Sequence, residues 1–107
     1  MDIRSLEQKA IDLAKRGDFG TEARQVNEEL AQLEPSNQGA WTRLARCNIE
    51  MGLYSDANAA LERALELNPQ NIIARSLLQE SIRREVRQSP EPAPAKRTRA
   101  SRAKGAK

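Results

Sequence analysis

The stretch AWTRLARCNIEMGLYSDANAALERALELNPQN, residues 40–71, decides the fold of this chain. Its first half spaces apolar residues as on one face of an α-helix, namely Trp41, Leu44, Ala45 and Ile49. After Gly52, a residue typical of helix ends, the second half repeats this spacing with Ala57, Ala60, Leu61, Ala64 and Leu65. The stretch therefore predicts two amphipathic helices, over about 39–51 and 55–67, joined by a tight turn.

Two similar patterns precede this pair and one follows it. They predict helices over about 2–16, 21–33 and 72–87, separated by Gly17, Pro35 and Pro69. We expect side-chain caps at the helix starts from Asp2, Thr21, Ser36 or Asn37, Ser55 and Asn71. In the last helix we expect one inward apolar stripe of Ile73, Leu77, Leu78, Ile82 and Val86, with an Arg/Glu face in water. Five helices with short turns predict an all-α stack of antiparallel hairpins.

The chain also matches itself at a fixed spacing. At 34 residues Pro69 matches Pro35, and so do the pairs Ala57 and Ala23, and Leu67 and Leu33. The spacing in the first half is 35, as between Gly52 and Gly17, so one extra residue lies in the first turn. A unit of helix, turn and helix that recurs at this period is typical of helical repeat proteins.

The residues that recur resemble the tetratricopeptide repeat, through Trp41, Leu44, Ala45, Gly52, Tyr54, Ala57 and the run Ala64-Leu65-Glu66-Leu67-Asn68-Pro69. The resemblance covers a clear unit over about 38–71, a degenerate unit over about 3–37, and a last helix similar to half of a third unit. Asn48 departs from the family's aromatic residue, and Asn27 stands where the second unit has Leu61. The resemblance implies a short α-solenoid of about two and a half repeats over residues 1–88.

The same resemblance implies a function. In this family the first helices of successive units line a concave groove that holds an extended peptide or a helix of a partner protein. Carried over residue by residue, that groove would comprise Thr42, Arg46, Ile49 and Glu50, then Glu7, Ile11, Ala14 and Lys15, then Ser76, Glu80 and Arg83. The Lys and Asn that clamp chaperone C-termini in some members are replaced by Thr42 and Arg46, so chaperone tails are not expected ligands. The expected function is a non-catalytic adaptor or scaffold, acting through this groove or through an end face.

The last helix leaves two interpretations open. Repeats of this kind bury their faces only against neighbours, and roughly three units are usual for stability. Helix 72–87 would either cap the end of the stack with its polar face, or leave an end that a partner or a second copy completes.

The C-terminal residues differ in composition from the rest. Residues 1–89 hold 12 Lys and Arg against 14 Asp and Glu, whereas residues 90–107 hold six against one. Residues 89–107 are rich in Pro and Ala and lack larger apolar side chains, which predicts a disordered basic tail. Its cations could contact nucleic-acid phosphates without sequence preference, and they are Lys96, Arg97, Arg99, Arg102, Lys104 and Lys107. An accessory nucleic-acid binder is thus the alternative function, and a targeting signal or a solubilising terminus are the other interpretations of the tail.

The composition of the chain does not favour catalysis, a cofactor or a metal site. The chain has no His and a single cysteine, Cys47, which is expected to be a packed thiol. Neither a Gly-rich phosphate loop nor a nucleophile elbow is present in the sequence, so an enzyme is not expected. No segment has the length and apolarity of a signal peptide core or a membrane span, and we expect a cytoplasmic protein.

Overall fold

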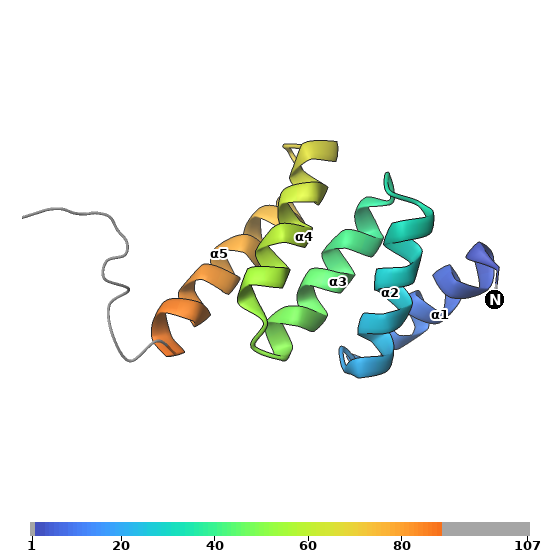
Figure 1. The fold of residues 1–107 in the computed structure, drawn as a ribbon, viewed down its shortest axis with the longest axis horizontal. Helices are drawn as coiled ribbons and strands as arrows, with labels where there is room; N and C mark the ends of the chain where they lie inside the picture. Colours follow the sequence, from blue (N-terminus) through green and yellow to red (C-terminus); the bar gives the residue numbers. More distant parts are fainter. Residues whose placement is uncertain (1, 89–107) are drawn as a thin grey trace, which may run out of the picture.

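A computed structural model describes residues 2–88 of the chain, which form five α-helices and no strand. The helices are α1 (Ile3–Lys15), α2 (Thr21–Leu33), α3 (Gln38–Glu50), α4 (Tyr54–Leu67) and α5 (Ile72–Gln88). They follow one another in chain order along the long axis of the molecule (Figure 1). The predicted all-α helical repeat is confirmed.

The helices form two rows. Each helix packs against the next one in the chain, and α3 also contacts both α1 and α5. Within residues 2–88, by contrast, α2 and α4 do not contact each other. The odd-numbered helices therefore lie closer together than the even-numbered ones, and the stack curves around the surface of α1, α3 and α5. We call this surface the odd-helix face.

Asparagine and aspartate side chains cap three of the five helices. The backbone N–H groups of Ser5, Ala40 and Ala74 donate to the Oδ1 atoms of Asp2, Asn37 and Asn71 at 2.8, 3.0 and 3.0 Å. These three caps are as predicted. The caps predicted at Thr21 and Ser55 are wrong, because the helices begin earlier: Gly20 and Leu53 hold the N-cap positions, without a side-chain cap.

The turns inside the two hairpins depend on glycine. Gly17 and Gly52 have φ angles of 71° and 77°, in the left-handed region that residues with a Cβ atom avoid. Each follows the last turn of a helix, α1 or α3, and reverses the chain into the next helix. Gly17 and Gly52, which match in the sequence at a spacing of 35 residues, therefore also share the same backbone conformation and the same position in a turn.

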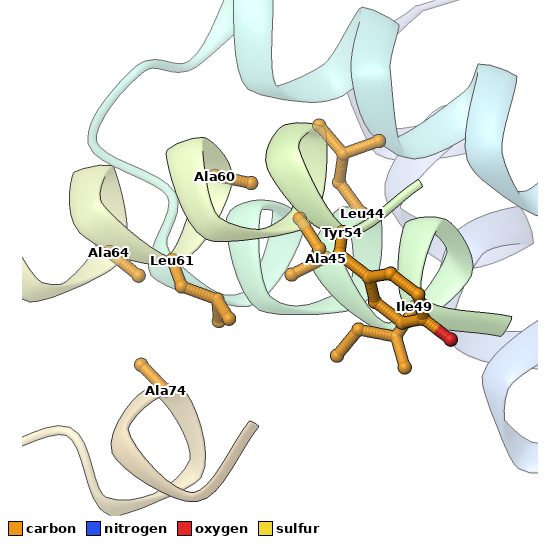
Figure 2. Packing of buried hydrophobic residues seen from close by; sticks show 9 residues of the cluster. Leu44, Ala45, Ile49, Tyr54, Ala60, Leu61, Ala64 and Ala74 are labelled. Atoms are coloured by element: carbon orange, nitrogen blue, oxygen red, sulfur yellow. The ribbon is translucent and has the colours of Figure 1, made fainter. Parts of the chain in front are cut away.

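The core is built from leucine, isoleucine and small residues. Ala45, Ala57 and Ala64 are fully buried where α3, α4 and α5 meet, and their small side chains let the helix backbones approach closely. Leu61 fills the space between these contacts and has no exposed surface. Figure 2 shows Leu61 and Ala64 of α4 pointing toward Ala74 of α5. Two smaller clusters continue the core through α1 and α2.

The face that α5 turns toward the stack differs from the prediction. Ala74 and Ser81 are its buried residues, and Leu77 and Leu78 are partly buried. Ile73, Ile82 and Val86 were expected inside but are 64%, 48% and 69% exposed. The helix seats its small residues against α4 because these allow the closest approach, which leaves much of the larger apolar stripe in solvent.

Candidate functional site

The odd-helix face displays part of the predicted groove. The exposed or half-exposed members of the predicted set are Glu7, Ile11, Ala14, Lys15, Arg46, Glu50, Ser76, Glu80 and Arg83. The prediction that Thr42 and Ile49 line an accessible groove is wrong, because both residues are buried. Thr42 is 8% exposed and its hydroxyl donates to the carbonyl of Gly39 at 3.0 Å. Ile49 is 1% exposed and packs in the core beside Tyr54, so it offers a partner little surface.

Ion pairs join four of the predicted residues into one network across α3 and α5. Arg46 Nε and Arg84 Nη1 lie 3.2 and 3.8 Å from Glu50 Oε2. Arg84 Nε and Arg83 Nη2 donate to the two carboxylate oxygens of Glu80 at 2.7 and 2.8 Å. Hydrogen bonds from Arg84 and Arg83 lower the pKa of Glu80, and the bond to Glu80 raises the pKa of Arg84. The network holds the side chains in place while leaving them in contact with water.

Hollows lie on both sides of Arg46 and Glu50. One, of about 170 Å³, lies between α3 and α5 and reaches Ile49, Leu77 and the Glu80–Arg84 pair. The other, of about 360 Å³, lies over Gly17 and Phe19. The Arg46 guanidinium sits 5.0 Å from the centre of the Phe19 ring. The centre of the odd-helix face thus combines paired charges with two depressions that contain apolar side chains.

Glu7, although predicted as a groove residue, takes part in a polar network among α1, α2 and α3. Its carboxylate lies 3.6 Å from Arg43 Nη2 and accepts a hydrogen bond from Asn37 Nδ2 at 2.9 Å. Arg43 Nε donates to Oδ1 of Asn27 at 2.9 Å, and Asn27 is 1% exposed. Burial lowers the pKa of Arg43, and the charge of Glu7 opposes that shift. Asn27, which departs from the leucine of the second unit, is therefore the buried partner of an arginine.

A further hollow, which the sequence did not indicate, lies between α2 and α4. It measures about 390 Å³, has Leu44 and Ala60 among its lining residues, and is bordered by charged residues that include Arg63. The Arg63 guanidinium sits 5.5 Å from the centre of the Trp41 ring, and the indole N–H donates to the carbonyl of Pro35 at 2.8 Å. The hollow exists because α2 and α4 do not touch, a property of the helix arrangement that periodicity does not reveal.

Cys47 is a buried thiol, as expected. It is 0% exposed among Leu13 and Ala23, and burial raises its pKa to about 11. Since the thiolate is the reactive form, its fraction at pH 8 falls about 100-fold relative to an unperturbed thiol of pKa 9.0. We expect a soluble disulfide reagent to leave Cys47 unmodified in the folded protein and to react fully in denaturant. Rapid reaction of the folded chain at pH 8 would contradict this burial.

The described residues contain neither a cluster of metal ligands nor a membrane-spanning helix. Residues 2–88 contain no group of three His, Cys, Asp or Glu side chains placed to hold a metal ion. None of the helices in this range is long and apolar enough to span a membrane. The six cations proposed for nucleic-acid contact, with the whole predicted tail, lie outside the described residues.

A match to one family model places the chain among known proteins. A search of curated protein sequences found no match. The family model described as "Tetratricopeptide repeat" matches residues 13–80, from the end of α1 to the middle of α5. That range includes both glycine turns and all of α2, α3 and α4. The match covers more than half of the chain and agrees with the observed stack of helical hairpins, so the chain belongs to the tetratricopeptide repeat family.

Proposed function

We propose that this chain is a non-catalytic adaptor that binds a protein partner on the odd-helix face, centred on Arg46 and Glu50. Tetratricopeptide repeats generally mediate protein–protein interactions, and the family typically serves as a scaffold without enzymatic activity. The partner presents an extended peptide or one face of a helix, because the row formed by α1, α3 and α5 is elongated.

The observation that carries this proposal is the charged network between two hollows. Arg46 and Glu50 are 45% and 38% exposed, so a partner can reach both side chains. Their ion pair, together with the stacking of Arg46 on Phe19, fixes their positions before binding. Side chains that are ordered beforehand lose less conformational entropy when a partner binds. Apolar partner residues would enter the hollows at Phe19 and Leu77 while charged residues meet the network.

The mixed charge of the face also indicates what kind of peptide fits. Arg46, Arg83 and Arg84 alternate with Glu50 and Glu80, so neither a strongly acidic nor a strongly basic segment is favoured. A segment with charges of both signs, interrupted by one or two apolar side chains, complements the face best.

Site-specific photo-crosslinking tests the location of the partner. A photoreactive residue replaces Ser76, an exposed residue of α5 that belongs to the predicted groove set, or Glu28, an exposed residue at the hollow between α2 and α4. In a lysate of the source cells we expect one dominant protein adduct from position 76 and none from position 28. Adducts from position 28 alone would place the partner on the even-numbered helices and overturn the proposal.

A further inference from the structure

The last helix packs against the stack as the first helix of a third unit. At a spacing of 34 residues, Ala74 matches Ala40 and Ser81 matches Cys47, and all four are 0% exposed. Ala74 faces the core residues of α4, as Figure 2 shows. α5 therefore stands in the same relation to α4 as α3 does to α2, although the family match ends at residue 80.

A second face of α5 is more exposed than the equivalent face of α3. On α3, Leu44 and Asn48 are 7% and 2% exposed, and α4 packs against the helix that carries them. Their counterparts at a spacing of 34 are Leu78, which is partly buried, and Ile82, which is 48% exposed. Val86, one turn further on, is 69% exposed. No helix of residues 2–88 follows α5 to cover this face, so an apolar stripe is left in water.

The Leu78–Ile82 part of the stripe has a charged residue on each side, in an order that complements itself. Arg75, Leu78, Ile82 and Glu85 follow at spacings of three, four and three residues, the pattern of a seam between two packed helices. Arg75 and Glu85 lie five residues on either side of position 80, and Leu78 and Ile82 lie two residues on either side. Two antiparallel copies of α5 related by a two-fold axis at position 80 would set Arg75 opposite Glu85 and Leu78 opposite Ile82.

The charges at the two ends are also available. Among residues 2–88, neither Arg75 nor Glu85 belongs to an ion pair, whereas Glu80, Arg83 and Arg84 on the same helix all do. Glu80, Arg83 and Arg84 pair within α5 or with α3, on the odd-helix face. Within residues 2–88, the stripe therefore carries charges that no ion pair uses, beside Leu78, which the core covers only in part, and Ile82, which is 48% exposed.

We propose that the chain forms a two-fold homodimer in which Arg75, Leu78, Ile82 and Glu85 of α5 pack antiparallel against the same residues of a second copy. Consecutive helices of a repeat hairpin run antiparallel. The α5 helix of the second copy therefore runs in the direction that a second helix of the third unit would take, and it covers the face that no helix of residues 2–88 covers.

The opposite end of the stack explains why this assembly stops at two copies. The exposed side chains of α1 are mostly polar, among them Arg4, Ser5, Gln8, Asp12 and Lys15. An end of this kind is soluble without a neighbour, and an isologous contact uses the same surface on both copies, so the dimer closes. Because the seam and the network of Glu80 and Arg84 lie on different sides of α5, the dimer would present two odd-helix faces.

Sedimentation equilibrium of the full chain tests the dimer. The seam is a single helix pair, smaller than a standard interface, so we expect a weak dimer. The mass should rise from 12.0 kDa at low concentration toward twice that value as the concentration increases. Ile82→Asp should remove this rise, whereas Ile73→Asp, at a 64% exposed isoleucine of the same helix outside the seam, should retain it. Circular dichroism checks that both variants keep their helices.

A charge exchange makes the test specific for the antiparallel register. Glu85→Arg sets two arginines opposite each other at both ends of the seam and should weaken the dimer about tenfold or more. The double variant Arg75→Glu/Glu85→Arg restores opposite charges and should dimerise nearly as well as the unaltered chain. A mass of 12.0 kDa at every concentration would overturn the proposal. So would unchanged association of Ile82→Asp, or a double variant as weak as Glu85→Arg alone.

Discussion

Replacing Leu61 with alanine is expected to lower the free energy of unfolding by about 2–5 kcal/mol. Leu61 is 0% exposed and packs in the cluster that α3, α4 and α5 share. The substitution removes apolar contacts and leaves a cavity that fully packed neighbours refill only in part. Because small domains are stable by only about 5–15 kcal/mol in total, a loss of this size brings the domain close to unfolding. Urea denaturation followed by circular dichroism measures it.

Leu67→Ala is the matched control for this substitution. It makes the same chemical change on the same helix, but Leu67 is 41% exposed. We expect a loss of about 0.5 kcal/mol or less. Equal losses from the two substitutions would show that the core does not lie where α4 meets α3 and α5.

The second large effect concerns the polar network around Arg43. Arg43→Leu should lower the free energy of unfolding by about 1–3 kcal/mol, because Oδ1 of the 1% exposed Asn27 loses its donor. Asn27→Leu should have a similar effect, since Nε of the largely buried Arg43 guanidinium loses its acceptor. Urea denaturation of each single variant provides both values.

The double variant Asn27→Leu/Arg43→Leu should recover most of the stability. At a spacing of 34 residues, Asn27 and Arg43 match Leu61, which is buried in the cluster of α3, α4 and α5, and Leu77, which packs against that cluster. The double substitution copies that pair into the first interface, and replacing both partners of a buried polar contact with apolar groups is often nearly neutral. Additive losses from the two single substitutions would show that the Arg43–Asn27 contact contributes nothing.

The fold could be predicted from the sequence because its determinants are local. Gly17 and Gly52 permit the left-handed backbone that the two turns need, and Pro35 and Pro69 exclude a continuous helix at their positions. Each acts within a few residues, so its position in the sequence is its position in the structure. The errors at Thr21 and Ser55 also concern only the first turn of a helix, where side-chain caps compete with neighbouring residues.

The candidate site was only partly predictable because exposure depends on neighbouring helices. Ile49 lies on the groove side of α3 by its position in the repeat, yet it is covered by the core around Tyr54 and by the side of α5 that bears Leu77. In α5 the size of the apolar residues was misleading. Ile82 and Val86 suggested the inner face, but the close approach of α5 to α4 requires the small Ala74 and Ser81 there. The helical period shows which residues share a face of a helix, but the packing of the neighbouring helices determines which face is buried.

The role of Arg46 is tested most directly by the affinity of the crosslinked partner for two matched variants. Arg46 and Arg63 each sit over an aromatic ring and each pair with a glutamate one turn on, but Arg46 lies on the odd-helix face and Arg63 beside the hollow between α2 and α4. Isothermal titration calorimetry should show binding about tenfold weaker for Arg46→Ala and unchanged for Arg63→Ala. Unchanged affinity for Arg46→Ala together with weakened binding for Arg63→Ala would contradict the account.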